Sequence, residues 1–252
     1  MNQDNNTVPA QYKIVPFLIG TFLITWICAF LKPVFDYENL RWLVVSLDFI
    51  ESASPLIMAI ILQRHYIFNG RQAIRFFLGE KRGVLSYIIV FVLFLIQFLN
   101  FYLFKTDMPP LSFSAFIITF ASQLFFGGGL EEGGWRGYLL PAFEKKFPVL
   151  LSSLFVSLIW VFWHIPYFFM PGTMQDSQNF IFYSIVGIIT GFILTAIYKL
   201  TRSVLLCTLF HSWQNAIVMS IQADTGNPWF MVIFILLGVM SVIICLRVKK
   251  NS

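Results

Sequence analysis

The run VLSYIIVFVLFLIQFLNFYLF, residues 84–104, contains no charged side chain and is long enough to cross the hydrocarbon core of a bilayer as one helix. The rest of the chain has the same character, since 58% of its 252 residues are hydrophobic and only 12% are charged. Soluble domains are roughly 45–50% apolar and about 25% charged, so one water-soluble core cannot bury this much apolar surface. We therefore predict an all-α, multi-pass membrane helix bundle.

Eight apolar runs have about the length of a transmembrane helix. The fourth is interrupted by Gly127-Gly128-Gly129, and we expect its helix to continue well past Leu130. The short connections predict a single membrane-embedded domain over residues 1–252, and the first run lacks a signal-peptide cleavage pattern. The eight runs are Ile14–Leu31, Trp42–Leu62, Val84–Phe104, Leu111–Leu130, Val149–Phe169, Phe180–Tyr198, Val204–Ile221 and Trp229–Leu246.

The basic residues predict which side faces the cytoplasm. With eight spans both termini lie on one side, and 13 of the 17 lysines and arginines fall there, including Lys13 and the loop from Arg64 to Arg82. An excess of Lys and Arg in short loops marks the cytoplasmic side, so we place both termini in the cytoplasm of a cell. This topology explains the net charge of +5 without a nucleic-acid partner.

Charged groups inside spans are costly and mark functional sites or buried pairs. The densest group is GGGLEEGGWRGY, residues 127–138. Glu132 and Arg136 are four residues apart on one helical face and can pair. Glu131 is rotated by about 100° from Glu132 and points elsewhere. The alternative is an ion cluster that only ties helices together.

Two further elements carry histidines. Trp160 and His164 are four residues apart, as are His211 and Asn215, so each pair shares a helical face. Either histidine can instead be a hydrogen-bonded packing residue between spans. Counting helical rise places Glu131 and His164 about 24 Å from the turn between them and His211 about 15 Å from its own turn. The three lie at one level when the hairpin between the fourth and fifth spans projects about 9 Å farther into the cytoplasm, and we therefore expect one site in the cytoplasmic half of the bilayer, opening toward the cytoplasm.

A carboxylate, two imidazoles and a carboxamide around one pocket hold the parts for metal-free hydrolysis. Glu131 is expected to take a proton from water that His164 helps to hold. His211 and Asn215 are expected to stabilise the oxyanion that forms when water attacks a carbonyl. Glu132 and Arg136 would position the helix and balance charge.

These three elements resemble the motifs of the CPBP family, the CAAX-type and bacteriocin-processing intramembrane glutamic endopeptidases, also called the Abi group. The resemblance covers a core of about residues 123–220, with Trp160 where many members have Phe. It implies an α-helical membrane protease without a cofactor, in which Glu131 and His164 activate water and His211 and Asn215 form the oxyanion site. It also implies a peptide or lipid-modified protein as substrate, in CAAX processing, bacteriocin maturation or self-immunity.

Three other interpretations remain open. A zinc peptidase would use His164, His211 and one of the two glutamates as ligands, although no His-Glu-x-x-His element is present. A non-catalytic immunity or scaffold protein would use the polar cluster for packing alone, and a transporter would line a path with it. Asp48 and Glu51, three apart in the second span, are expected to pack against another polar group.

Overall fold

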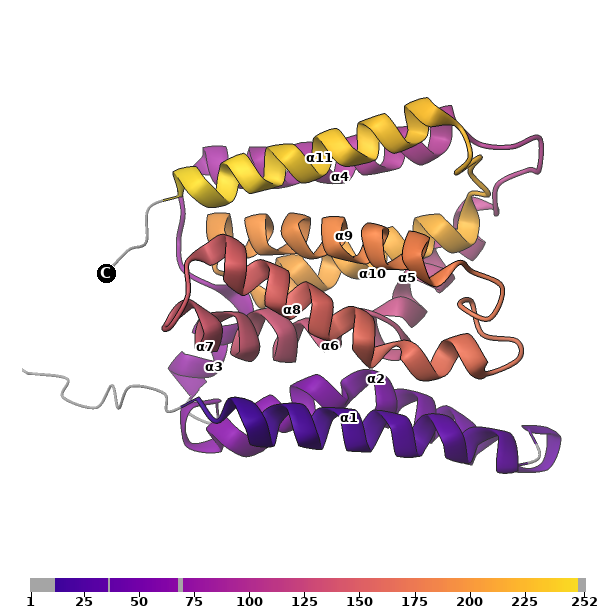
Figure 1. The fold of residues 1–252 in the computed structure, drawn as a ribbon, viewed down its shortest axis with the longest axis horizontal. Coiled ribbons are helices and arrows are strands. Elements are labelled where there is room, and N and C mark those ends of the chain that lie inside the picture. The colour runs from indigo at the N-terminus through magenta and orange to yellow at the C-terminus, as the bar shows by residue number, and fades with distance from the viewer. Residues whose placement is uncertain (1–11, 36, 68–69, 249–252) are drawn as a thin grey trace, which may run out of the picture.

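The computed structural model describes residues 12–35, 37–67 and 70–248, and these form a bundle of α-helices (Figure 1). The predicted all-α membrane bundle is confirmed. The helices are α1 (Ile14–Leu31), η1 (Lys32–Val34), α2 (Tyr37–Ile67), α3 (Gly70–Leu78), α4 (Val84–Leu103), α5 (Phe113–Phe126), α6 (Glu131–Gly134), η2 (Trp135–Leu139), α7 (Leu140–Glu144), α8 (Val149–Trp163), η3 (Ile165–Phe169), α9 (Phe180–Thr201), α10 (Val204–Ser220) and α11 (Pro228–Arg247).

Six of the described helices are long and apolar enough to cross a membrane, and the bent pair of α5 with the segment Glu131–Glu144 makes a seventh. The run predicted over Val204–Ile221 forms α10, which has 17 residues and is shorter than each of the six spans, of which Val149–Phe169 joins α8 and η3. Each of the eight predicted runs therefore contains a helix, while the number of spans that the structure supports is six or seven.

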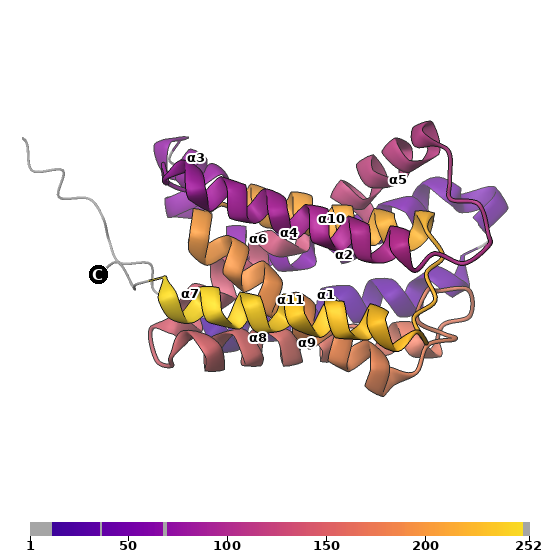
Figure 2. The same ribbon diagram turned by 90° about the horizontal axis from the view of Figure 1, so that it is seen from above.

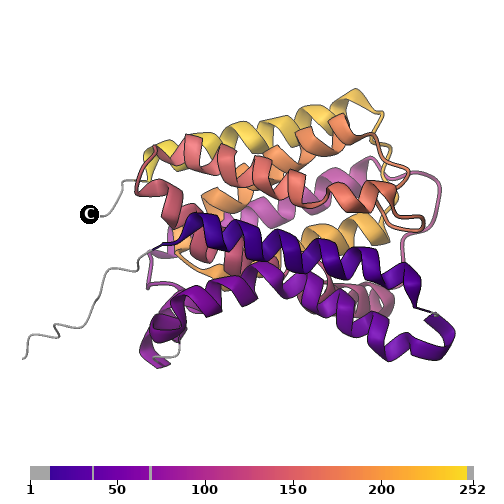
Figure 3. The same cartoon turned by 60° about the horizontal axis from the view of Figure 1, so that its bottom comes forward.

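The helices run back and forth along one long axis. α1 packs against α2, α8 against α9, and α9 against α11, while α10 lies beside α5 (Figures 2 and 3). α1 begins and α11 ends at the same end of the bundle, which also carries α3 and α7 (Figure 1). We call it the basic end, and the opposite end, where α1 ends and α2 begins, the distal end.

The fourth predicted span is broken. α5 ends at Phe126, and a new helical segment begins at Glu131, bent by 41° from α5. Gly128 between them has φ +60°, a left-handed conformation that side chains disfavour, so the glycine run terminates the helix. The prediction of one helix continuing past Leu130 is wrong.

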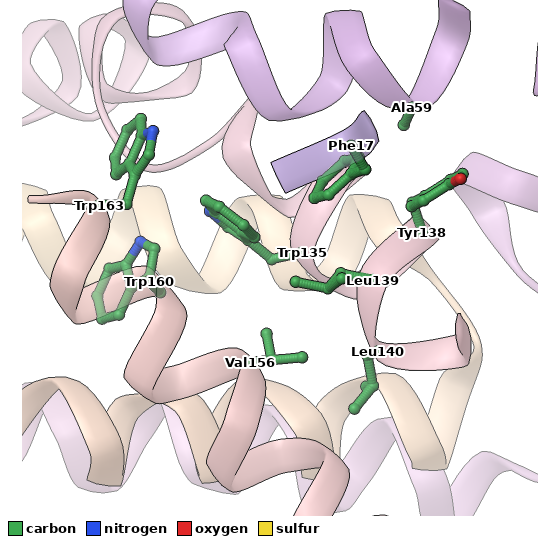
Figure 4. Close-up of a cluster of buried hydrophobic side chains, with 9 residues drawn as sticks. All are labelled: Phe17, Ala59, Trp135, Tyr138, Leu139, Leu140, Val156, Trp160 and Trp163. Carbon is green, nitrogen blue, oxygen red and sulfur yellow. The ribbon is translucent and has the colours of Figure 1, made fainter. Parts of the chain in front are cut away.

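A packed core fills the bundle between the break and the basic end. The segment that starts at Glu131 continues as a π-helical turn, η2, and then as α7, and its large side chains are fully buried. Phe17 of α1 stacks on Tyr138, with ring centroids 4.7 Å apart, and Trp135 contacts Trp163 edge-on (Figure 4). This packing fixes the start of α6 relative to α1 and α8. The core residues are Phe17, Ala59, Trp135, Tyr138, Leu139, Leu140, Val156, Trp160 and Trp163.

Candidate functional site

A pocket of about 670 Å³ lies at the helix break. Its wall includes five of the residues singled out by the sequence: Glu131, Trp160, His164, His211 and Asn215. The three motifs, from α6, α8 and α10, therefore meet around one cavity. Glu132 and Arg136 are fully buried and lie outside its lining.

Glu131 is the first residue of α6 and is only 4% exposed. One carboxylate oxygen, Oε2, accepts hydrogen bonds from the indole N–H groups of Trp160, at 2.7 Å, and Trp135, at 3.3 Å. The other, Oε1, accepts from the backbone N–H of Gly128 at 3.0 Å. Three donors thus hold the carboxylate in one orientation at the pocket wall, where solvent access is low.

Glu132 is held by a different set of partners. Its Oε1 lies 3.0 Å from Nη1 of Arg136 and 2.8 Å from Nδ1 of His211. Arg136 also donates to the carbonyl oxygen of Gly191 on α9, so the predicted Glu132–Arg136 pair joins α6, α9 and α10. The two adjacent carboxylates therefore have different surroundings: Glu132 is paired with a cation, and Glu131 faces the pocket.

His164 follows the last residue of α8, and its ring is oriented by the backbone. Nδ1 lies 2.8 Å from the carbonyl oxygen of Trp160, which can only accept, so Nδ1 carries a proton. In the neutral ring this leaves the lone pair on Nε2. The Trp160 indole contacts both imidazoles edge-on, with centroids 4.9 Å from His164 and 5.3 Å from His211.

Asn215 pairs with Gln123, a residue that belongs to none of the three sequence motifs. Nδ2 of Asn215 donates to Oε1 of Gln123 on α5 at 3.2 Å, and both residues line the pocket. A carboxamide nitrogen has two protons, so a second donor remains on Asn215. Gln123 has no spacing relation to Asn215 in the sequence, because α5 meets α10 only through the fold.

The backbone at Gly128 lies directly against the side chains of His211 and Asn215 on α10. A Cβ at this position would lie 2.7 Å from Cδ2 of His211 and 2.8 Å from Nδ2 of Asn215. The glycine therefore lets the broken backbone approach the pocket and present its N–H to Glu131.

We expect Gly128→Ala to destabilise the protein, because the added Cβ must displace the side chains of His211 and Asn215, and such overpacking typically costs about 1–3 kcal/mol. Left-handed backbone costs a further ~1–2 kcal/mol of stability. Gly172→Ala is the matched control, since Gly172 also has positive φ, +81°, but a Cβ there meets nothing within 4 Å. The thermal stability of both purified variants tests this, and equal effects would contradict it.

A second polar group lies at the distal part of the pocket wall, and the sequence analysis named two of its members, Asp48 and Glu51, without identifying their partner. Lys32 at the end of α1 pairs with Asp48 at 2.8 Å and with Glu51 at 3.0 Å, and Tyr167 donates to Glu51 at 2.5 Å. All four line the pocket. Asp48 and Glu51 thus pack against a polar partner, as expected, and that partner is Lys32.

The pocket extends toward the distal end. Besides the motif residues, its lining includes Lys32, where α1 ends, and Thr173, Gln175 and Gln178 in the connection between η3 and α9. The segment Glu131–Glu144 continues from the helix break to the basic end, and its bulky side chains are buried there.

Within the described ranges, no three His, Cys, Asp or Glu side chains are grouped so that they can hold a metal ion. The hydrogen bonds of the pocket side chains explain why they do not converge on one point. Nδ1 of His211 is directed at Glu132, and the oxygens of Glu131 are directed at two indoles and a backbone amide.

The fold and pocket define an integral, multi-pass α-helical membrane protein with a polar site inside its bundle. Residues 113–217 match the family model described as type II CAAX prenyl endopeptidase Rce1-like. The chain is also 26% identical over 138 residues to CAAX prenyl protease 2 of Methanococcus maripaludis, across 51% of this chain and 48% of that protein. The chain thus spans about half the length of this curated relative. Both matches confirm, through the central part of the chain, the resemblance to the CPBP family.

Proposed function

We propose that this protein is an intramembrane endopeptidase that hydrolyses a peptide bond of a membrane-associated or lipid-modified peptide. The observation that carries the proposal is the pocket in which Glu131, His164, His211 and Asn215 meet. The matches to CAAX-type endopeptidases support the same reaction class. The cell membrane is the proposed location.

In the proposed reaction Glu131 takes a proton from water, and the oxygen attacks the carbonyl carbon of the scissile bond. Nε2 of His164 holds the water, since its Nδ1 is already bonded to the Trp160 carbonyl. The tetrahedral intermediate then breaks its C–N bond, and the proton held by Glu131 passes to the leaving amine. One water is consumed, and a new carboxylate and a new amine are released.

The oxyanion of this intermediate needs hydrogen-bond donors at fixed positions. Asn215 supplies the second proton of its carboxamide nitrogen, the first being directed at Gln123. Nδ1 of His211 faces the acceptor carboxylate of Glu132, so His211 is the second donor in the imidazolium form, in which Nδ1 donates to Glu132 and Nε2 donates to the oxyanion. Glu132 and Arg136 act as positioning residues for this ring.

The test uses purified protein and one synthetic peptide, made with and without a C-terminal farnesylcysteine. We expect cleavage into two fragments detectable by mass spectrometry, faster for the farnesylated form if the relative's named CAAX prenyl activity extends to this chain. A bacteriocin-type precursor peptide serves as a second substrate. No cleavage of any of them, together with unchanged membrane peptides in cells that lack the protein, would favour the non-catalytic immunity or scaffold alternative.

Chelation separates the metal-free mechanism from the zinc alternative. Because the carboxylate of Glu131 and Nδ1 of His211 already bond to protein groups, we expect 1,10-phenanthroline to leave the cleavage rate unchanged. A zinc peptidase would lose activity and regain it on addition of zinc. Measurement of the zinc content of the same preparation provides a second test.

A further inference from the structure

We infer that α3 lies in the lipid headgroup layer at the basic end of the bundle and binds anionic phospholipid there. The helix is separate from the pocket, so this role does not depend on the proposed function. Three observations support it: the position of α3 between two spans, the face that its packing leaves exposed, and the charge around it.

α3 connects two membrane spans at one end of the bundle. The span Asn39–Arg64 of α2 precedes it, and the span Val84–Leu103, which is α4, follows it (Figure 1). With nine residues α3 is too short to cross the bilayer itself. Because a span ends where the hydrocarbon core ends, a short helix between two spans lies at the level of the lipid headgroups.

The inner side of α3 is packed against the turn between α9 and α10. Phe76 is 8% exposed and belongs to a buried cluster with Val204 of α10. The hydroxyl group of Ser203 donates to the carbonyl oxygen of Phe77 at 3.0 Å. Gly79 follows the helix with φ +78°, and a Cβ there would lie 2.5 Å from a backbone carbonyl oxygen at the end of α9. These contacts fix which face of α3 is turned away from the bundle.

The outward face of α3 has an apolar row beside a basic row. Ile74 and Leu78, four residues apart, are 61% and 56% exposed, and Phe77 next to them is 36% exposed. Arg71 and Arg75, also four residues apart, are both exposed. At 100° per residue the two rows lie about 60° apart around the helix. Helices in the membrane interface have this arrangement, with apolar side chains among the acyl chains and basic side chains at the headgroups.

The charge around α3 is strongly positive, because five basic residues surround it and Glu80 is the one acidic residue among them. Glu80 pairs with Arg75 at 2.8 Å and with Arg82 at 3.1 Å, so one carboxylate is shared by two guanidinium groups. Arg71 and Lys81 are exposed and form no ion pair with another described residue. The five basic residues are Arg64, Arg71, Arg75, Lys81 and Arg82.

An anionic phospholipid fits both rows at once. Its phosphate is attracted by the basic row, and its acyl chains cover the apolar row. A soluble anion would leave Ile74 and Leu78 in water, and a neutral lipid would leave the arginines without a counter-charge. The combination of the two rows therefore favours a bilayer surface that contains anionic headgroups.

Native mass spectrometry of the purified full chain tests the basic row. The protein is titrated with phosphatidylglycerol and, separately, with phosphatidylcholine, and the dissociation constant of the first bound lipid is measured. We expect the double variant Arg71→Gln, Arg75→Gln to bind phosphatidylglycerol about tenfold more weakly, because each basic side chain adds to the attraction of an anionic surface. Binding of phosphatidylcholine should not change.

The double variant Lys145→Gln, Lys146→Gln is the matched control. Both lysines are exposed between α7 and α8 at the same end of the bundle, so it removes the same charge from another surface. We expect it to leave phosphatidylglycerol binding nearly unchanged. The inference is overturned by unchanged binding in the arginine variant, by equal weakening in both variants, or by an equal loss of phosphatidylcholine binding.

Ile74→Cys tests the apolar row. With an environment-sensitive fluorophore on this cysteine, in vesicles of equal parts phosphatidylcholine and phosphatidylglycerol, we expect quenching by lipids that carry a spin label near the top of the acyl chain. Acrylamide in the water should quench little. Background labelling is low, because the three native cysteines are at most 6% exposed. Quenching by acrylamide alone, or a disulfide between two copies of this variant, would show that water or a second chain covers the row and would contradict the lipid assignment.

Discussion

Replacing Glu131 by Gln is expected to lower peptide cleavage by about 10²–10⁴-fold, the range typical of a lost general acid–base group. The carboxamide has nearly the same shape and can still accept from the indoles of Trp135 and Trp160, so the pocket should persist. It cannot take the proton from water. The measurement compares membrane peptides and released fragments from cells that contain wild-type or Glu131→Gln protein at equal amounts.

Glu80→Gln is the matched control for this prediction. Glu80 is 44% exposed, pairs with Arg75 and Arg82, and lies outside the pocket, so the same chemical change should leave the fragments unaltered. Fragments that persist in the Glu131→Gln cells would contradict the assigned role. Loss in both variants would indicate an effect on the membrane protein as a whole.

Arg136→Met is expected to have the largest effect on stability. Arg136 and Glu132 are both 0% exposed, and removal of Arg136 leaves the buried carboxylate of Glu132 with the His211 ring alone; breaking a buried pair in this way costs about 3–5 kcal/mol. For a chain of this size that corresponds to a fall in the unfolding midpoint of roughly 6–20 °C. Thermal unfolding in one detergent measures it.

An exposed-arginine variant and a double variant test whether the loss of stability comes from the buried pair. Arg75→Met removes an arginine whose side chain is 60% exposed, and such a surface pair contributes about 0–1 kcal/mol. Adding Glu132→Gln to Arg136→Met removes the stranded charge, so the double variant should unfold at a higher temperature than Arg136→Met alone. Equal midpoints for the single and double variants would show that the buried pair is not the cause.

The sequence predicted the helical bundle because lipid-facing helices need long apolar runs, which are visible without any knowledge of packing. It also predicted the Glu132–Arg136 pair, because a four-residue spacing fixes neighbours on a helix. That His164 and His211 lie at one site with Glu131 was predicted from their depths along the helices, with a hairpin between the fourth and fifth spans that projects farther than its neighbour.

The remaining features depend on contacts between distant segments. The break at Gly128 needs the approach of α10, and the pair of Gln123 with Asn215 needs α5 to lie beside α10. Lys32 meets Glu51 only when α1 and α2 adopt one rotation about their axes, which composition does not determine.

The central claim is that the carboxylate of Glu131 activates water in this pocket. Its most direct measurement is the cleavage rate of one peptide by equal amounts of folded, purified wild-type and Glu131→Gln protein, with a chelator present throughout. We expect steady cleavage by the wild type and a rate at least about a hundredfold lower for the variant. Comparable rates for the two proteins would contradict it.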